Sequence, residues 1–142
     1  KDTIVLAGGE NVEPERIETR IKTSPLVEQV VVLGQDQKTL GALLVPNPEC
    51  LAQEIPEAEW DRRDGVLRGA AVQKRLRAEL DRLVTRDAGF RSLERIAAFR
   101  VLAEPLSAEN GLLTQTMKVR RHVVAERFAR LIEEMFRGVG DE

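Results

Sequence analysis

A basic segment near the end of the chain holds the residues best suited to chemistry. Lys118 follows a polar, glycine-containing stretch, and Arg120 and Arg121 come within three residues of it. A lysine on such a loop presents a compact positive charge on a long stem, which suits contact with a phosphate or a carboxylate. Cations at a helix start oppose the helix dipole by about 0.3–1 kcal/mol each. A solvated basic helix start is the common alternative, and these residue types alone leave both interpretations open.

The composition argues against several classes of site. The net charge is −2, acidic and basic residues are interspersed, and aromatic residues make up 4% of the chain. We therefore do not expect a nucleic-acid surface built on bulk positive charge or base stacking. Cys50 and His122 are the only residues of their types, so an internal disulfide and a Cys/His zinc site are excluded. No carboxylate pair or Ser/His/Asp set with catalytic spacing is present, and we predict no metal site.

The length of 142 residues fits one domain, and 42% apolar residues are enough for a core. The single cysteine is compatible with a reducing compartment, and neither a long apolar run nor a signal-peptide pattern is present. We expect a cytoplasmic protein, with peripheral membrane contact as a further option. Because the chain begins without Met in a β-rich run, we expect it to be part of something longer.

The N-terminal part of the sequence predicts a hairpin and a helix. Residues 3–6 form a short β-rich run that ends in the Gly8-Gly9 turn, where glycine permits a positive φ angle. The glycine spacing matches neither a phosphate-binding loop nor a dinucleotide fingerprint. Pro14 suits the first position of a helix, and two isoleucines four residues apart predict one buried stripe over residues 14–23.

Two clean apolar runs follow, at residues 27–33 and 40–45, with a polar turn between them. They predict an antiparallel pair of buried strands. Residues 46–65 show no clear period, and we predict a short helix near residues 49–54 followed by an irregular, acidic surface segment.

The second half predicts two amphipathic helices and one more strand. Apolar periodicity places the helices at residues 71–86 and 121–137, and an apolar run places the strand at residues 97–102. A short turn or helix is expected before the strand, and residues 107–115 are expected to form an exposed loop. The predicted fold class is α+β, with a small mixed or antiparallel sheet of about three strands plus an N-terminal hairpin, flanked by helices. In this fold Lys118 would lie just before the first turn of the last helix.

Two stretches of the sequence resemble known motifs in a known order. Residues 1–18 (KDTIVLAGGENVEPERIE) resemble the hinge-and-hairpin motif that opens the C-terminal domain of acyl-adenylate-forming enzymes. These enzymes are the acyl-CoA synthetases, firefly luciferase and the adenylation domains of peptide synthetases. Residues 114–121 (TQTMKVRR) resemble the closing motif of that domain, which carries its catalytic lysine. Residues 30–47 (VVVLGQDQKTLGALLVPN) are similar to long-chain fatty acyl-CoA synthetases, so the resemblance covers nearly the whole chain.

The resemblance implies that residues 1–142 are the mobile C-terminal domain of an ATP-dependent long-chain fatty acid–CoA ligase. In such an enzyme the acid attacks the α-phosphate of ATP, with Mg²⁺, and gives an acyl-adenylate and pyrophosphate. The small domain then swings on its hinge, and the CoA thiol attacks the acyl carbonyl. By this resemblance Lys118 is the adenylation lysine and Lys1 is the hinge residue.

The resemblance also assigns roles to the two ends of the domain. The turn of Gly8, Gly9, Glu10 and Asn11 would face the active site beside the CoA channel during the thioester step. Which of the two glycines takes the special turn position is left open. The implied partners are the enzyme's own N-terminal domain together with fatty acid, ATP and CoA, and the domain alone is expected to bind none of them stably. Met117 departs from the family, which usually has glycine before the catalytic lysine.

Several alternatives stay open. Arg120 and Arg121 could contact the CoA phosphates or an anionic lipid, or they could form part of a solvated helix face. The chain could be a stand-alone, non-catalytic binding domain with the same fold. It could also belong to a synthetase for an aryl, medium-chain or branched acid, because the acyl pocket of such enzymes lies in the other domain.

Overall fold

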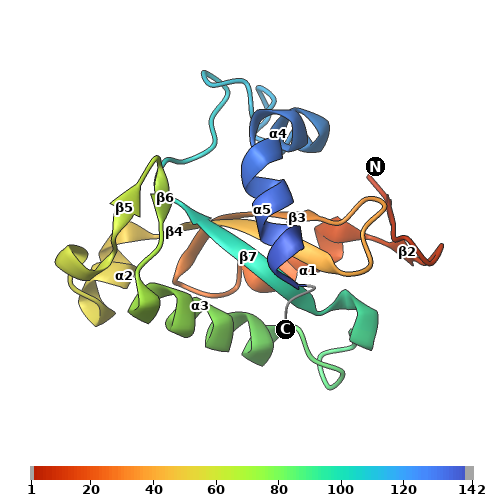
Figure 1. Ribbon diagram of the computed structural model, residues 1–142, viewed down its shortest axis with the longest axis horizontal. Helices are drawn as coiled ribbons and strands as arrows, with labels where there is room; N and C mark the ends of the chain where they lie inside the picture. Colours follow the sequence, from red (N-terminus) through yellow and green to blue (C-terminus); the bar gives the residue numbers. More distant parts are fainter. Residues whose placement is uncertain (1, 140–142) are drawn as a thin grey trace.

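The computed structural model describes residues 2–139, in which a central sheet lies between two layers of helices (Figure 1). A separate two-stranded hairpin, β1 (Ile4–Val5) with β2 (Asn11–Val12), precedes the sheet. The sheet has five strands in the order β3-β4-β7-β6-β5. Their bounds are β3 (Val27–Leu33), β4 (Leu40–Pro46), β5 (Arg62–Arg63), β6 (Val66–Leu67) and β7 (Ile96–Leu102). β3 is antiparallel to β4, and β4 is parallel to β7.

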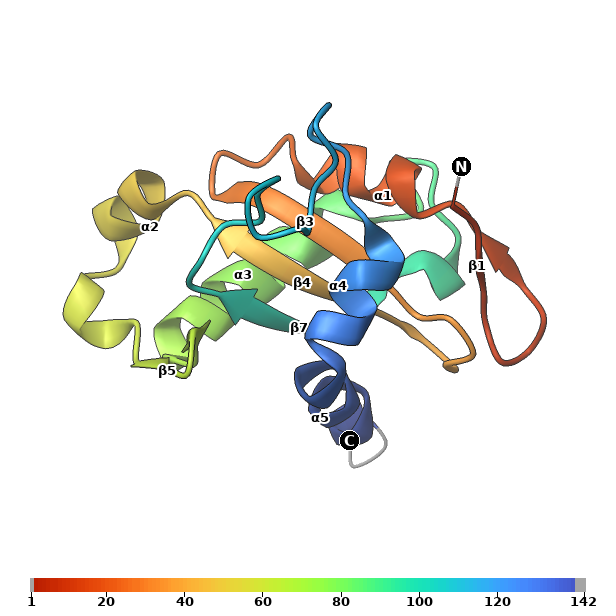
Figure 2. The ribbon, with the colours of Figure 1, turned by 90° about the horizontal axis from the view of Figure 1, so that it is seen from above.

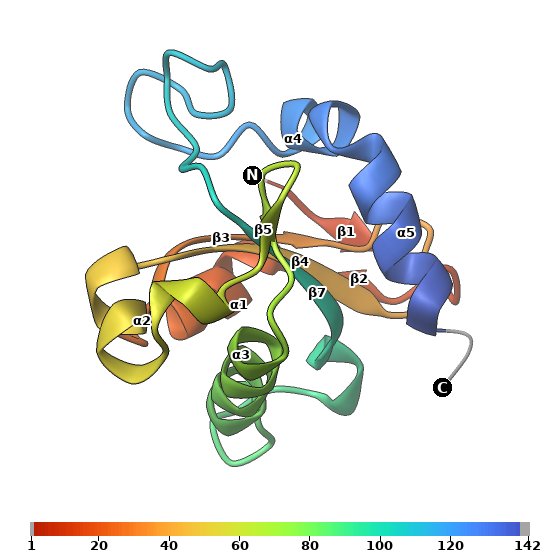
Figure 3. The ribbon, with the colours of Figure 1, turned by 60° about the vertical axis from the view of Figure 1, so that its left-hand side comes forward.

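The helices cover both faces of the sheet. The bounds are α1 (Pro14–Ile21), α2 (Pro48–Glu54), α3 (Ala70–Leu83), α4 (Arg121–Arg127) and α5 (Ala129–Val139), with short 3₁₀ turns at Glu57–Glu59 and Ser92–Glu94. Figure 2 shows α4 in front of β3 and β4, with α1 and α3 behind them. Figure 3 shows the same two layers from the side, with α4 and α5 on one side of the sheet and α1 and α3 on the other.

The long strands are apolar along most of their length because both faces of the sheet are covered. In β3, Val30 and Val32 are buried in the core shared with α1 and α3. Val31 and Leu33 are buried in the second core, which is shared with α4 and α5. Successive side chains of a strand point to opposite faces, so one unbroken apolar run supplies both cores.

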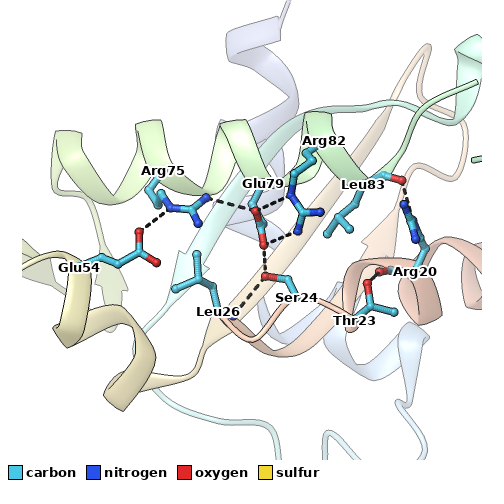
Figure 4. Close-up of polar contacts among 9 residues, drawn as sticks. All are labelled: Arg20, Thr23, Ser24, Leu26, Glu54, Arg75, Glu79, Arg82 and Leu83. Atoms are coloured by element: carbon cyan, nitrogen blue, oxygen red, sulfur yellow. Dashed lines mark hydrogen bonds and ion pairs between the residues drawn. The ribbon is translucent and has the colours of Figure 1, made fainter. Parts of the chain in front are cut away.

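A buried carboxylate on α3 connects this helix to the segment that follows α1 (Figure 4). Glu79 on α3 is only 3% exposed. It accepts hydrogen bonds from the Ser24 hydroxyl, from Arg75 at 3.2 Å and from Arg82 at 3.0 Å. Arg75 also donates to Glu54 at the end of α2, at 2.7 Å. The hydrogen bond from Arg82 is the largest of the influences that lower the pKa of Glu79 to about 2, although burial works in the opposite direction.

Most of the predicted elements are confirmed. The hairpin, the helix that begins at Pro14, the antiparallel pair of apolar strands, the short helix after β4, the helix α3 and the strand β7 are all present at or near the predicted positions. The α+β class with flanking helices is also confirmed, and the three expected strands are the three long ones.

The prediction of an irregular segment after α2 was wrong in part. β5 and β6 form a short hairpin there and extend the sheet beyond β7. Trp60, which precedes the hairpin, is buried, and its indole N–H donates to the carbonyl of Ile55 at 2.9 Å. The turn between the strands is Asp64-Gly65, with φ angles of 51° and 76°. An Asp-Gly pair flanked by strand residues is a hairpin signal, so the sequence did carry a trace of this element.

The final helix was predicted as one segment, but it is two helices with a break at Phe128. Phe128 has φ −107° and ψ 25°, and it packs in the second core. The apolar stripe continues across the break, so the pattern alone could not locate it. The loop predicted as exposed at residues 107–115 contains two buried leucines, Leu112 and Leu113.

Candidate functional site

Lys118 lies at the end of a tight hairpin loop. The amide nitrogen of Thr114 is 2.8 Å from the carbonyl oxygen of Lys118, and the amide nitrogen of Met117 is 2.9 Å from the carbonyl oxygen of Thr114. The Thr114 hydroxyl accepts a further hydrogen bond from the amide of Lys118 at 3.1 Å. An antiparallel bridge between Leu113 and Val119 closes the base of the loop. This pattern is that of a three-residue hairpin loop.

The loop is fixed to the domain at its base. Leu112 and Leu113 are 3% and 5% exposed and belong to the second core. The amide nitrogen of Arg120 is 2.9 Å from the carbonyl oxygen of Leu112. Lys118 itself is exposed. An exposed cation therefore stands on a backbone whose geometry is set by buried neighbours.

Met117, the residue before the lysine, has the left-handed backbone conformation. Its φ angle is +66° and its side chain is 65% exposed. The third position of a three-residue hairpin loop takes this conformation and favours glycine. The backbone conformation therefore suits glycine at this position, and here a methionine adopts it at some steric cost.

Arg121 connects the segment after Lys118 to three other parts of the domain. Its guanidinium donates to Glu18 on α1 at 2.6 Å, to the carbonyl of Val32 on β3 at 2.7 Å and to Asp2 at 3.0 Å. The side chains of Arg121 and Glu18 are 12% and 11% exposed. Burial alone would lower the pKa of Arg121, but the hydrogen bonds to Glu18 and Asp2 outweigh it and raise the pKa above its ordinary value.

The contact with CoA phosphates or lipid that the sequence suggested for Arg121 stays a prediction, and in this structure its guanidinium is engaged within the domain. Arg120 is exposed and donates one hydrogen bond to the carbonyl of Gly111 at 3.2 Å. For Arg120 the anion contact stays a prediction.

A cleft of about 540 Å³ brings part of the predicted site together. Asp2, Lys118 and Arg121 all line it, beside Glu15 and Glu18 of α1. The predicted hinge residue Lys1 lies outside the described residues, next to Asp2. A larger groove of about 940 Å³ lies between the β5–β6 hairpin and the last two helices, but Lys118 does not line it.

The Gly-Gly turn forms a second loop of the same kind, away from this cleft. The amide nitrogen of Leu6 is 2.9 Å from the carbonyl oxygen of Glu10, and the amide nitrogen of Gly9 is 2.8 Å from the carbonyl oxygen of Leu6. Gly9 has a φ angle of +90°. Gly9, rather than Gly8, thus has the positive φ angle that favours glycine. Neither glycine lines the cleft of Lys118, and neither do the following residues Glu10 and Asn11.

This N-terminal hairpin is attached to the loop between β3 and β4. The amide of Ala7 donates to the carbonyl of Gln37 at 2.8 Å, and the amide of Asp36 donates to the carbonyl of Val5 at 3.0 Å. The amide of Val5 also donates to the side chain of Gln35 at 3.1 Å. The hairpin and the sheet therefore form one body.

Residues 2–139 contain neither a metal-binding cluster nor a helix suited to span a membrane. No group of three or more His, Cys, Asp or Glu side chains there is placed to hold a metal ion. Within the same range, no helix has both the length and the apolar character needed to cross a membrane.

The chain is similar to known proteins over nearly its whole length. Residues 1–140 match a protein family described as AMP-binding enzyme C-terminal domain. The chain is 37% identical to the long-chain-fatty-acid–CoA ligase FadD15 of Mycobacterium tuberculosis over 142 residues, which are 96% of this chain and 23% of that protein. It is 36% identical to a chloroplastic long-chain-fatty-acid–[acyl-carrier-protein] ligase of Arabidopsis thaliana, with 96% of this chain and 17% of that protein covered. The chain therefore spans about a fifth of the length of these relatives.

The fold also matches a solved structure. The A-PCP didomain of a carboxylic acid reductase from Segniliparus rugosus, in complex with AMP, is 31% identical with a TM-score of 0.76. The match covers 94% of this chain and 17% of that one.

Proposed function

Because the chain belongs to the AMP-binding enzyme C-terminal domain family, we propose that it is the mobile C-terminal domain of an ATP-dependent long-chain fatty acid–CoA ligase. The observation that carries this proposal is the position of Lys118, which stands exposed at the end of a hydrogen-bonded loop in a chain of this family. The remainder of the active site would come from an N-terminal domain of the same enzyme. The choice of a long-chain acid follows the names of the relatives.

Lys118 would act in the first half-reaction. A carboxylate oxygen of the fatty acid attacks the α-phosphorus of ATP, a new P–O bond forms, and pyrophosphate leaves with the electrons of the broken bond. The Lys118 ammonium would hold the attacking carboxylate near the phosphorus and offset negative charge on the transferring group. The buried leucines under the loop support this role because a positioned charge needs no reorganisation at the moment of reaction.

The N-terminal hairpin would act in the second half-reaction. After rotation of the domain, the loop of Gly8, Gly9, Glu10 and Asn11 would face the acyl-adenylate, and the CoA sulfur would attack the acyl carbon as AMP leaves. Gly8 and Gly9 carry no side chain, so a thin pantetheine arm can pass close to the backbone. The exposed Arg120 would contact phosphates of CoA, with an anionic lipid surface as the alternative.

ATP, Mg²⁺ and CoA belong to the whole enzyme in this proposal. The described residues hold no cluster of metal-binding side chains, so we assign no Mg²⁺ ligand to this domain. The protein would work in the cytoplasm, with peripheral membrane contact as an option for a ligase of fatty acids.

The test is fatty-acid-dependent ATP–pyrophosphate exchange in the full-length protein. Lys118→Ala should lower the exchange rate by roughly 10²-fold or more, the scale expected for one preorganised electrostatic contact. The same variant should still form thioester from supplied acyl-adenylate and CoA. Lys38→Ala, which removes an exposed lysine from the loop between β3 and β4, should change neither rate.

The outcomes separate the alternatives. Equal loss of both half-reactions in a folded Lys118→Ala protein would remove the role of the lysine. Exchange that depends on an aryl or medium-chain acid but not on a long-chain acid would change the substrate class. A wild-type protein without exchange for any of these acids would support a binding domain that reuses the fold.

A further inference from the structure

We propose that Asp2 is a positioning residue, which clamps the incoming chain to Arg121 so that the domain rotates at a single point ahead of Asp2. The clamp has this role only if the chain works as the mobile domain proposed above. Asp2 itself would touch neither substrate nor the reacting atoms.

The first support is that Arg121 is a fixed anchor. Its hydrogen bonds to Glu18 and to the carbonyl of Val32 hold the guanidinium against α1 and β3. Its side chain is 12% exposed, so it has little freedom to move. The guanidinium then presents its Nε–H to Asp2 at 3.0 Å. A planar guanidinium fixed on two sides offers its remaining donor in a defined direction.

The second support is that the chain is held at each residue from Asp2 onward. Asp2 is bonded to Arg121, and the next residue, Thr3, donates its hydroxyl to Glu13 at 3.0 Å. β1 then begins at Ile4 and pairs with β2. These side-chain contacts restrain Asp2 and Thr3 between the body of the domain and the chain that precedes it.

The third support is where the clamp lies relative to Lys118. Arg121 is three residues after Lys118, and Asp2, Arg121 and Lys118 line the same cleft. Asp2 and the lysine both lie close to the buried guanidinium of Arg121, along the chain or in the cleft. Without its bond to Arg121, Asp2 could turn more freely, and the lysine would sample a wider range of positions relative to the other domain.

The experiment compares the full-length protein with its Asp2→Asn and Asp2→Glu variants. The neutral amide keeps the shape of Asp2 but loses the charge-assisted bond, whereas Asp2→Glu keeps the charge. In Asp2→Asn we expect kcat for pyrophosphate exchange to fall about 10-fold, within the 10²-fold that a misplacement of about 1 Å can cause. KM for ATP and fatty acid should change little. Asp2→Glu should recover part of the loss.

A structural readout accompanies the kinetics. Spin labels are placed on the N-terminal domain and on α3 through Ala78→Cys, with Cys50→Ser to remove the native thiol. Asp2→Asn should broaden the distribution of distances between the labels, and thermal stability should change little because Asp2 is half-exposed and Arg121 keeps its pairing with Glu18. The control is Glu133→Gln, which removes an exposed partner of Arg137 on α5 and should alter none of these quantities.

An unchanged distance distribution and an unchanged kcat in Asp2→Asn would overturn the proposal. A loss of activity that comes with a lowered unfolding temperature and a normal distribution would also overturn it, because Asp2 would then serve stability alone. Absence of exchange in the wild-type protein would count against the ligase assignment instead, and the label distances would still test the clamp.

Discussion

Gly9 and Met117 occupy equivalent positions in two hairpin loops with the same hydrogen bonds. Each donates its amide to the carbonyl oxygen three residues earlier, at 2.8 Å and 2.9 Å, and each has a positive φ angle, +90° and +66°. Glu10 and Lys118 follow them in the two loops. The two motif segments of the domain therefore share one loop conformation. The residue with the positive φ angle is glycine in one loop and methionine in the other.

Met117→Gly should stabilise the domain. Glycine removes a steric penalty of about 1–2 kcal/mol for the left-handed conformation, and its greater freedom in the unfolded chain offsets about 0.5–1 kcal/mol of this gain. The net increase in the free energy of unfolding should be about 0.5–1 kcal/mol, measured by urea denaturation. Thr116→Gly is the control, because Thr116 is exposed and has no positive φ angle, and it should destabilise. Equal effects of the two substitutions would show that strain at Met117 is negligible.

Gly9→Ala should destabilise the domain by about 1–2 kcal/mol, because alanine strains a backbone with positive φ. A Cβ atom at Gly9 would meet no atom within 4 Å, so the effect would come from the backbone alone. The matched substitution is Gly8→Ala, where the new Cβ would approach the flexible carboxylate of Glu10 at 2.7 Å. That side chain can turn away, so Gly8→Ala should cost much less in the same urea denaturation. The reverse ranking would mean that Gly8 holds the turn.

Glu79 should make the domain sensitive to acid. Its pKa is about 2 in the folded domain, below the ordinary value of 4.5. Between these two pH values the unfolded chain binds the proton more tightly, so the stabilising contribution is complete above pH 4.5 and is lost as the pH falls toward 2. The contribution can reach about 3 kcal/mol.

The measurement is the free energy of unfolding at about pH 6 and about pH 3, for wild type and Glu79→Gln. The variant should be less stable at the higher pH and should lose less stability on acidification. Glu133→Gln, at an exposed ion pair, should follow the wild-type pH dependence. A Glu79→Gln curve parallel to that of wild type would show that other carboxylates dominate the acid response.

The Glu18–Arg121 pair should be energetically coupled. Removing one partner leaves the other charge largely buried, so Arg121→Met or Glu18→Gln alone should cost about 3 kcal/mol. The double variant should cost clearly less than the sum of the two single changes, because neither charge is then left behind. Arg137→Met, at an exposed pair with Glu133, should cost less than about 1 kcal/mol. Additive costs for the first pair would argue against coupling.

The sequence was informative wherever a physical constraint acts locally. β3, β4 and β7 were predicted because strands covered on both faces need unbroken apolar runs. β5 and β6 were not predicted, since each has two residues and depends on pairing such as that of Val66 with Leu102. The break at Phe128 was missed because the apolar stripe passes through it.

The same contrast between local and long-range information applies to the candidate site. The Gly8-Gly9 turn was predicted from residue types, and the segment of Lys118 was assigned as a site from resemblance, which stays a prediction. The role of Arg121 could not be found in this way, because its partner Asp2 lies 119 residues away in the sequence. A basic side chain beside a helix start looks the same in the sequence whether it binds a ligand or forms an ion pair within the domain. Only the folded arrangement distinguishes these cases.

The parallel pairing of β4 with β7 has a consequence for how the protein is made. The register of Leu40 with Ile96 cannot form until α2, the short β5–β6 hairpin and α3 have all been synthesised. At about 5–20 residues per second, the ribosome needs roughly 3–10 s for this interval. Throughout it, the edge of β4 that later pairs with β7 is unpaired, and the face that α4 and α5 later cover is bare, which is the condition that invites aggregation. We therefore expect this edge of β4 to be a site of aggregation in the nascent chain until β7 emerges.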